Sequence, residues 1–395
     1  MRIRKNIPIV DTVGKDFSDA LERLSLAGLN EAYLFLRSFN ELSDGQKYRY
    51  RVARLIDSSA KTWVLDEFTS ILDRVTARVV AYCLQKAARR VGATVLAVTT
   101  HAEIIDDLNP DIIVRKGMGS HVSVEYRKPE PRECIILKQV VIERGGRRDY
   151  EVLKHFHYLG GLPGWRRAIF GARVGEEVAG VIVYAAPLLQ LAGRFRALPI
   201  LRELRQKDPK EYARFVTNNF TRIARVIVHP KYRSIGLGAM LVRETMPLVG
   251  TRYVETLAVM AKYNPFFEKA GMSKVDAPPP RDEELERIEA MGIRIVPGSL
   301  RKMASSLKRL PPAQLKEIKA LCIRRLERLR EMRVKSRSDL LRRLKKGIDI
   351  EAIAKTLTMT PRPAVYLMRS YTLLRREPFL QGEKNLKYKD SRFSF

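Results

Sequence analysis

The sequence has 395 residues, and its 74 Lys and Arg outweigh its 44 Asp and Glu to give a formal net charge of +30. This length predicts two or three domains, and a hydrophobic content of 45% excludes disorder throughout. No apolar run reaches the ~18 residues of a membrane-spanning helix, and the basic amino-terminal segment lacks the apolar core of a signal peptide. Three scattered cysteines exclude a disulfide framework and a cysteine zinc cluster. We therefore expect a cytoplasmic protein.

The first third of the sequence predicts an α/β domain over residues 1–130. Apolar residues recur at helical spacing within residues 16–39, and residues 72–91 predict a long helix closed by Gly92. Three short apolar runs, at 62–65, 94–100 and 111–114, predict buried parallel strands. The Pro-Glu-Pro-Arg stretch at 129–132 marks the first boundary.

The middle of the sequence predicts an α+β domain over residues 131–278. Its expected strands lie at 135–142, 168–173, 178–184, 222–228 and 253–259, and its expected helices at 150–157, 236–248 and 264–270. The strands at 168–173 and 178–184 flank a Gly-Glu-Glu turn and predict an antiparallel hairpin. Residues 188–219 predict a basic, mostly helical insertion. A run of prolines at 278–280 marks the second boundary, after which residues 279–395 predict a basic all-α region.

The positive charge is concentrated at the carboxyl-terminal end. Residues 301–395 hold 26 Lys and Arg against 9 Asp and Glu, a surplus of +17, whereas residues 131–300 carry +10 and residues 1–130 only +3. Binding of a polyanion explains such a concentration, because each cation placed at a phosphate releases condensed counterions. The alternative is a solvated helical face.

Four ordered motifs in the first domain indicate nucleotide chemistry. They are Leu-Ser-Asp-Gly-Gln at 42–46, Val-Leu-Asp-Glu at 64–67, Ser-Ile-Leu-Asp at 70–73, and His101 after the next strand. In this order they resemble the signature, Walker B, D-loop and switch histidine of the carboxyl-terminal half of an ABC-type ATPase. The resemblance implies nucleotide binding by six residues: Ser43, Gly45, Gln46, Asp66, Glu67 and His101. A signature loop presents its hydroxyl and amides at a helix N-terminus, which suits a γ-phosphate. Asp66 would hold Mg²⁺, and Glu67 would orient the attacking water.

The phosphate-gripping Walker A loop is missing from residues 1–41. Gly14-Lys15 lacks both the preceding glycine and the following hydroxyl residue. Three explanations stay open. The start codon is assigned too late and the amino-terminal half is missing, a P-loop-bearing partner subunit supplies the loop, or the site is degenerate.

The stretch at 226–240 contains a second phosphate-binding pattern. Its Arg-Ser-Ile-Gly-Leu-Gly run follows an expected strand and opens an expected helix. Residues 135–275 resemble the GNAT N-acetyltransferase fold, whose glycine loop binds the diphosphate of acetyl-CoA. The resemblance implies cofactor binding by Ile227, Val228, Arg233, Ser234, Gly236, Leu237, Gly238, Ala239 and Asn264.

Catalytic residues in this domain are harder to assign. Phe267 stands where many family members have a tyrosine acid, and Tyr263, one turn earlier, is the substitute unless it is an ordinary residue at a helix start. Glu255 is the candidate base, with a solvent-facing side chain as the alternative. His157 lies on the expected substrate side, and the alternative is a helix end capped by Gly160.

The carboxyl-terminal region contains a pattern that resembles a helix-turn-helix at 351–369. Arg362, Tyr366 and Arg369 fall on one face of its expected second helix, which extends over 361–374 and is positioned to read a nucleic-acid groove. Thr358 stands where the turn usually has glycine. The alternative is a plain helical hairpin.

The whole layout resembles an archaeal-type ABC ATPase fused to a GNAT-family acetyltransferase domain. The leading hypothesis is an N-acyltransferase that uses acetyl-CoA, acts on or at nucleic acid, and is coupled to an incomplete ABC ATPase module. The alternative is an ATP-gated, nucleic-acid-binding ABC-type protein whose acetyltransferase-like domain is non-catalytic.

Overall fold

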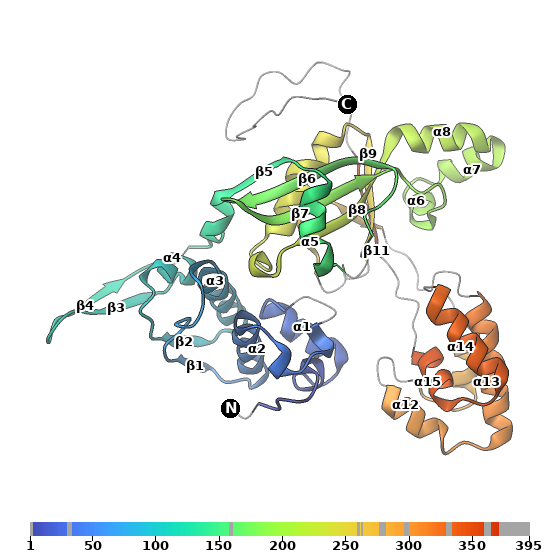
Figure 1. The fold of residues 1–395 in the computed structure, drawn as a ribbon, viewed down its shortest axis with the longest axis horizontal. Coiled ribbons are helices and arrows are strands. Elements are labelled where there is room, and N and C mark those ends of the chain that lie inside the picture. The colour runs from blue at the N-terminus through green and yellow to red at the C-terminus, as the bar shows by residue number, and fades with distance from the viewer. Residues whose placement is uncertain are drawn as a thin grey trace. The chain divides into compact units, whose positions relative to one another are not determined.

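A computed structural model describes most of the chain (Figure 1). The described residues are 3–29, 34–128, 130–157, 161–258, 261, 264–275, 282–295, 300–328, 334–358 and 365–370. The chain forms two compact units: one comprises Met1–Asp276 together with Val365–Phe395, and the other comprises Ala277–Ala364. No helix within the described ranges is both long enough and apolar enough to cross a membrane.

The amino-terminal region, residues 3–128, is built on a small parallel sheet. Its helices and strands are α1 (Phe17–Leu26), α2 (Asp44–Asp57), β1 (Thr62–Leu65), α3 (Arg74–Val91), β2 (Thr94–Ala97), α4 (Ile105–Leu108), β3 (Ile112–Lys116) and β4 (Val122–Tyr126). β1 pairs with β2 in parallel, with Val64 beside Leu96. The core beneath the pair contains Trp63 and the apolar faces of α1, α2 and α3.

Helix α3 confirms the expected long helix and shows why it begins and ends where it does. The carboxylate of Asp73 accepts hydrogen bonds from the backbone N–H groups of Val75 and Thr76, both at 3.2 Å, and so caps the first turn. Gly92 ends the helix in the left-handed conformation, with φ +65°.

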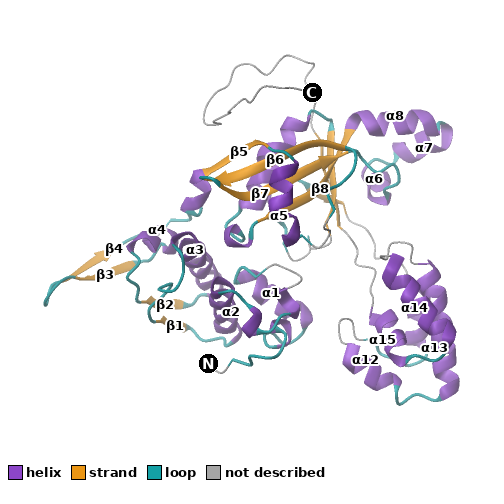
Figure 2. Cartoon of the chain, in the orientation of Figure 1, coloured by secondary structure: helices purple, strands orange, loops and turns teal. Residues whose placement is uncertain are grey.

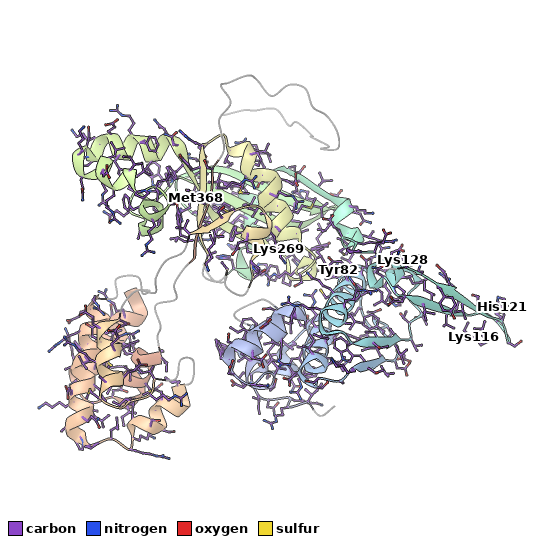
Figure 3. All side chains as sticks on the ribbon, turned by 180° about the vertical axis from the view of Figure 1, so that it is seen from behind. Tyr82, Lys116, His121, Lys128, Lys269 and Met368 are labelled. Carbon is purple, nitrogen blue, oxygen red and sulfur yellow. The ribbon has the colours of Figure 1, made fainter. Side chains whose placement is uncertain are left out.

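The expected third parallel strand at 111–114 is wrong. These residues belong to β3, which pairs antiparallel with β4 in a hairpin of its own. The turn after β3 reverses the chain, and Gly119 in that turn has φ +63°. Lys116 and His121 lie near the tip of the hairpin (Figure 3).

The sheet region, residues 134–275 together with 365–370, holds seven strands (Figure 2). Its elements are β5 (Val140–Arg144), α5 (Arg147–Leu153), β6 (Arg166–Val174), β7 (Glu177–Ala185), α6 (Ala192–Ala197), α7 (Ile200–Lys207), α8 (Pro209–Asn219), β8 (Phe220–Val228), α9 (Leu237–Thr245), β9 (Tyr253–Ala258), α10 (Phe266–Lys269), β10 (Ser273–Val275) and β11 (Val365–Ser370). The strand order is β10-β11-β9-β8-β7-β6-β5. The predicted hairpin is confirmed as β6 and β7, and the helical insertion as α6, α7 and α8.

One pair in this sheet is parallel. β8 pairs with β9 only from Phe220 opposite Tyr253 to Arg222 opposite Glu255, although both strands continue beyond that register. The two strands therefore separate after three residues. The expected strand at 135–142 starts later than predicted, because residues 135–139 form the short 3₁₀ helix η5.

The helix-turn-helix interpretation is wrong, because its second helix is a strand. Residues 365–370 form β11, which pairs antiparallel with both β9 and β10. Tyr366 and Leu367 are 3% and 0% exposed, so this strand is buried on both faces and lacks the alternation that marks a half-exposed strand. Arg362 lies outside the described residues.

The helical unit, residues 282–358, is thus inserted between two neighbouring strands of the sheet. It contains α11 (Glu283–Ala290), α12 (Leu300–Leu307), α13 (Pro312–Arg328), α14 (Val334–Lys346) and α15 (Ile350–Thr358). The helices share one apolar core, which includes Ile318 and Leu344, each 0% exposed. The buried Arg325 Nε donates to Asp282 Oδ2 at 2.8 Å, at the N-cap of α11.

Candidate nucleotide site

The signature-like motif forms the beginning of α2. Ser43 is the N-cap residue: its Oγ accepts from the N–H of Gln46 at 3.4 Å, and its own N–H donates to Gln46 Oε1 at 3.0 Å. Leu42 is buried and anchors the turn, whereas Ser43 is exposed. The motif therefore presents a hydroxyl at the positive end of a 14-residue helix, where anions are stabilised.

The Walker B-like acids lie at the carboxyl end of β1. Asp66 and Glu67 directly follow the strand and are both exposed, and Glu67 has a positive φ of +46°. The N–H of Glu67 donates to Asp66 Oδ1 at 3.0 Å. The N–H of Phe68 then donates to the carbonyl of Val98 at 2.8 Å, which keeps this turn beside the end of β2.

His101 lies beside the same strand ends. Thr99 Oγ1 donates to the carbonyl of Phe68 at 2.9 Å and accepts from the N–H of His101 at 3.1 Å. His101 Nδ1 is buried, lies 3.8 Å from Glu103 Oε1 and forms no hydrogen bond. A buried ring nitrogen without a hydrogen-bond partner is an unsatisfied group that a polar ligand can satisfy.

Contacts between α2 and the strand-end turn connect the signature motif to the acids. The Tyr48 hydroxyl donates to the carbonyl of Glu67 at 3.5 Å, and the Tyr48 ring meets Phe68 edge-on with centroids 6.2 Å apart. Gly45 packs against the start of α3, since a Cβ at this position would lie 2.8 Å from Thr76 Cγ2. These contacts connect the start of α2 to the strand-end turn. The resemblance assigns Ser43 and Gly45 to ATP held by a partner subunit, whereas Asp66, Glu67 and His101 need a Walker A loop beside them.

The side chains at this end of the region provide too few ligands to hold a metal ion by themselves. Within the described ranges, no group of three or more His, Cys, Asp or Glu residues could hold a metal. Mg²⁺ in nucleotide sites is commonly held by one or two carboxylates together with substrate phosphates. Asp66 fits that role only with a nucleotide present.

The D-loop-like residue Asp73 connects this end to the sheet region. Lys231 Nζ lies 3.3 Å from Asp73 Oδ1 and 3.5 Å from Glu177 Oε2. Burial raises the pKa of Asp73, but the hydrogen bonds from Thr76 and the charge of Lys231 outweigh it and lower the pKa overall. Arg49 from α2 adds a second contact, because its Nη1 donates to the carbonyl of Pro230 at 3.3 Å.

The glycine loop predicted to bind acetyl-CoA directly follows Pro230 and Lys231 in the sequence. Gly236 is the N-cap of α9 with φ +107°, a conformation that favours glycine. Arg233 Nε donates to the carbonyl of Val228 at 2.7 Å, and Gly238 packs against Val228 and Phe266.

Three of the residues predicted to contact acetyl-CoA are largely buried: Ile227, Leu237 and Ala239. The Ser234 backbone has φ +71°, and the carbonyl of Asn264 accepts from the N–H of Phe266 at 2.9 Å.

Glu255, the predicted base, is fully buried in a polar cluster. Its carboxylate accepts from Arg194 Nη2 at 2.5 Å and from the Tyr366 hydroxyl at 2.7 Å, and Arg194 is also 0% exposed. The solvent-facing alternative is therefore wrong, because the carboxylate is fully buried and is already held by Arg194 and Tyr366.

Of the other two predicted catalytic residues, His157 and Tyr263, the structure describes only His157. His157 follows the 3₁₀ helix Lys154–Phe156, and its N–H donates to the carbonyl of Lys154 at 3.1 Å. Phe267 is 6% exposed and belongs to the core. Tyr263 and Gly160 lie outside the described residues.

Two partners in these contacts, Arg194 and Arg49, could not be found from the sequence alone. Arg194 lies 61 residues from Glu255 within a basic insertion, where nothing distinguishes it from neighbouring arginines. Arg49 contacts a carbonyl 181 residues away. Only the fold brings these groups together.

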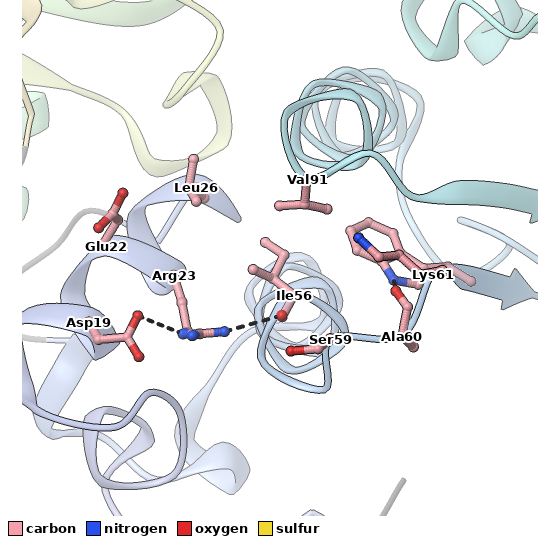
Figure 4. A pocket seen from close by; sticks show the side chains of 10 residues that line it. Asp19, Glu22, Arg23, Leu26, Ile56, Ser59, Ala60, Lys61 and Val91 are labelled. Carbon is pink, nitrogen blue, oxygen red and sulfur yellow. Dashed lines mark hydrogen bonds and ion pairs between the residues drawn. The ribbon is translucent and has the colours of Figure 1, made fainter.

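A surface pocket on the amino-terminal region contains none of these motifs (Figure 4). It is lined by Asp19, Glu22, Arg23, Leu26, Ile56, Ser59, Ala60, Lys61, Trp63 and Val91. Arg23 crosses it, with Nε donating to Asp19 at 2.8 Å and Nη1 donating to the carbonyl of Ile56 at 3.2 Å. Arg23 and Asp19 therefore already have hydrogen-bond partners among the residues that line the pocket.

Part of the chain is similar to bacterial ATP-binding proteins. The methionine import ATP-binding protein MetN of Helicobacter hepaticus is 32% identical over 121 residues, 29% of this chain and 34% of the relative. The protein of the same name from Streptococcus pyogenes serotype M6 is 35% identical over 133 residues, 32% of this chain and 35% of the relative. The Escherichia coli K12 protein is 38% identical over 84 residues, 21% and 24% of the two chains. The chain spans about a third or less of the length of these curated relatives, and no protein-family model matches it.

These relatives overturn one expectation. They are ATP-binding proteins, so the acetyl-CoA-dependent N-acyltransferase predicted from residues 226–240 is wrong. The burial of Glu255 against Arg194 agrees with this correction, because it leaves the predicted base without access to a substrate. The similarity instead shows an ABC ATPase-like region in part of the chain.

Proposed function

We propose that the amino-terminal region supplies the signature and strand-end half of an ABC-type ATP site. The observation that carries the proposal is the gathering of Ser43, the Asp66–Glu67 pair and His101 at one end of this region, through the contacts of Tyr48, Phe68 and Thr99. The similarity to ATP-binding proteins supports it.

Each group has a chemical role in this proposal. Ser43 and the amides of the first turn of α2 bind the γ-phosphate of ATP held by a partner subunit, and Gln46 holds Ser43 in position. Asp66 binds Mg²⁺ with the phosphates, Glu67 orients the attacking water, and the partly exposed imidazole of His101 makes a hydrogen bond to the γ-phosphate. Residues 1–41 contain no phosphate-gripping loop, so this proposal needs a P-loop from outside the given sequence.

The sheet region has the role of a non-catalytic, acetyltransferase-like domain. Its seven-stranded sheet and the glycine turn between β8 and α9 support this assignment of fold. Its contacts with the amino-terminal region include Lys231 and Pro230, just before this turn, and the apolar packing of Val79 and Cys83 of α3 in the core of the sheet region. In this proposal the domain is non-catalytic and packs against the nucleotide-binding region.

A second candidate function is polyanion binding by the helical unit. Several of its cations are exposed and form no ion pair with a described acid: Arg287, Arg294, Lys308, Arg309, Lys316, Arg324 and Lys346. Nucleic acid is the polyanion that such a density of Lys and Arg favours. Together the two functions describe an ATP-gated, nucleic-acid-binding protein.

Binding of Mg²⁺-ATP to the purified full chain tests the nucleotide proposal. We expect saturable binding with a Kd of about 1 mM, near −4 kcal/mol, in ligand-observed NMR. Ser43→Asp retains an N-cap residue but places a negative charge at the phosphate, so it should abolish binding. Ser58→Asp at the opposite, exposed end of α2 is the matched control and should bind normally. Binding that is absent in the wild type, or equal in all three proteins, would contradict the proposal.

A further inference from the structure

A β-bulge in β8 places two arginines on the same face of the sheet. Ala185 of β7 pairs with Arg222 of β8, and two residues earlier on β7, Val183 pairs with Arg225. β8 therefore contains one extra residue, Ala224, in this interval. Residues two apart on a strand share a face, and so do paired residues on neighbouring strands. Arg222 and Arg225 thus point to one side, although residues three apart in a regular strand face opposite sides.

The two arginines lie between two apolar clusters on this face. Ile227, two residues after Arg225, packs with the buried side chains of α5. Phe220, two residues before Arg222, packs with those of α7 and α8. Figure 1 shows α5 and the insertion of α6, α7 and α8 at different places along the sheet. The stretch of β8 between these clusters contains both arginines, and each is partly exposed.

These two cations lack a counter-charge. The Nε atoms of Arg222 and Arg225 are buried and form no hydrogen bond, and neither side chain forms an ion pair with an acid in the described ranges. The Nη1 atom of Arg225 donates to the carbonyl of Ala224 at 2.6 Å. Burial lowers the pKa of Arg222 and the charge of Arg225 lowers it further, whereas Glu255 raises it. Two like charges are therefore held near each other on a half-buried face.

Glu255 does not neutralise this pair of arginines. It lies opposite Arg222 in the pairing of β8 with β9, but its carboxylate accepts hydrogen bonds from Arg194 Nη2 at 2.5 Å and from the Tyr366 hydroxyl at 2.7 Å. The charge of Glu255 is thus balanced by Arg194. The positive charges of Arg222 and Arg225 remain, and charges withdrawn from water are stable when they are paired. The bulge therefore favours binding of an anion.

The chemistry of the two side chains indicates which anion fits. A guanidinium group presents a planar fork of N–H donors that matches the oxygens of a carboxylate or a phosphate. A phosphate monoester carries about −1.5 to −2 charges at neutral pH, whereas a carboxylate carries a single charge. Two neighbouring guanidinium groups therefore match a phosphate monoester better than a carboxylate.

We infer that Arg222 and Arg225 form a binding site for a phosphate monoester at the bulge of β8. The site belongs to the sheet region and uses none of the residues of the proposed nucleotide site. The monoester is part of a small phosphorylated molecule or the terminal phosphate of a nucleic-acid strand, since both present the same charged group.

Binding of inorganic phosphate to the purified full chain tests the site. Thermal unfolding in about 0.15 M sodium chloride, which screens exposed charges, should show a Tm that rises with phosphate concentration and saturates. Arg222→Gln and Arg225→Gln should each weaken binding at least tenfold, because charge-assisted hydrogen bonds are the strong ones. Arg202→Gln removes the same charge from an exposed position on α7 and is the matched control. Its affinity for phosphate should equal that of the wild type.

The same measurement shows whether the variants fold. Without phosphate, the Tm of Arg222→Gln should be no lower than that of the wild type, because the substitution removes a half-buried cation without a counter-charge. Arg222→Lys retains the charge but loses the planar fork, so its affinity should lie between those of the wild type and Arg222→Gln. Phosphate binding that is absent in the wild type, or equally strong in Arg222→Gln, Arg225→Gln and Arg202→Gln, would overturn the inference.

Two short oligonucleotides that differ only in a 5′-phosphate distinguish the two sources of the monoester. Tighter binding of the phosphorylated oligonucleotide by the wild type, with the preference lost in Arg222→Gln, would assign the site to a strand end. Equal binding of both oligonucleotides, together with phosphate binding that depends on Arg222, would assign it to a small phosphorylated molecule. A preference for the 5′-phosphate that persists in Arg222→Gln and Arg225→Gln would contradict the site.

Discussion

Lys231 Nζ lies 3.3 Å from Asp73 Oδ1, so the loop before α9 is attached to the first turn of α3. The same ammonium lies 3.5 Å from Glu177 Oε2 in the sheet region. Asp73 is 57% exposed at its side chain, and a pair this exposed contributes between about 0 and 1 kcal/mol. The pair matters for position more than for stability. Asp73, in the D-loop-like motif, both caps α3 and contacts Lys231 of the sheet region.

Substitution of Asp73 separates the cap from the ion pair. Asp73→Ala removes the acceptor for the N–H groups of Val75 and Thr76, and should lower the free energy of unfolding by about 1 kcal/mol. Asp73→Asn retains a capping acceptor and loses the ion pair with Lys231, so its cost should be a few tenths of a kcal/mol, roughly that of an exposed pair. Urea unfolding followed by circular dichroism measures both. Equal losses would show that Asp73 does not act as a cap.

The buried pair of Arg194 and Glu255 should dominate the stability of the sheet region. Both side chains are 0% exposed, and Arg194 also donates to the Tyr212 hydroxyl at 3.1 Å and lies 4.8 Å from the Phe220 ring. Glu255→Gln leaves a buried guanidinium without its counter-charge, which should cost about 3–5 kcal/mol. The double variant Arg194→Met/Glu255→Met should recover much of that loss, since replacement of a buried pair by apolar residues is often neutral. Thermal unfolding compares the two variants, and a double variant as unstable as Glu255→Gln would contradict this account.

Tyr366 distinguishes the observed strand from the helix that the sequence indicates. Its hydroxyl donates to Glu255 Oε2 at 2.7 Å, and its burial and its proximity to that carboxylate raise the pKa of the phenol. Tyr366→Phe deletes a hydrogen bond to a charged group and should cost about 1.5–3 kcal/mol in urea unfolding. Met368→Leu, at a half-buried position on the same strand, is the control. An unaffected Tyr366→Phe variant would place this residue outside the sheet.

His229 should make the stability depend on pH. Burial lowers the pKa of this imidazole, and the nearby Arg233, Lys231 and His155 lower it further, whereas Glu177 raises it. The native state thus favours the neutral ring, whose Nδ1 accepts from the N–H of Lys231 at 3.3 Å. The unfolded state takes up a proton as the pH falls through the ordinary value of 6.5, so stability is complete above that pH and declines below it.

The His229→Asn variant checks this dependence, because asparagine retains an acceptor but does not titrate. Its urea midpoint should change less than that of the wild type between about pH 7.5 and 5.5, the window in which histidine charges. His121→Asn, at the exposed tip of the β3–β4 hairpin, should retain the dependence of the wild type. If the His229→Asn variant loses as much stability as the wild type on acidification, groups other than His229 cause the pH dependence.

Local signals in the sequence predicted α3 and the β6–β7 hairpin well, because a cap at Asp73, a glycine at 92 and a tight turn act within a few residues. The apolar run before Asp66 also predicted its position at a strand end, whereas the helix start at Ser43 was implied only by the resemblance to a signature loop. The strand at 365–370 escaped prediction because its partner β10 ends 90 residues earlier, before the whole helical unit. Tyr366 and Arg369 are three residues apart, a spacing that equally suits a helix face. Arg194 and Tyr366, the polar partners of Glu255, meet it only through long-range contacts, so no local pattern in the sequence indicates them.

The exposed cations of the helical unit should determine how its nucleic-acid binding responds to salt. Lys316→Gln/Arg324→Gln removes two cations that form no ion pair with a described acid, and should lower the slope of log K against log salt by about 0.9 for each duplex phosphate that is no longer neutralised. Arg342→Gln/Lys345→Gln is the matched control, because Arg342 lies 2.5 Å from Asp339 and Lys345 lies 3.3 Å from Glu327. Fluorescence anisotropy with a short duplex at about 50 to 200 mM salt measures both slopes. A slope that is unchanged in the first variant, or equally reduced in the control, would mean that these side chains do not contact phosphates.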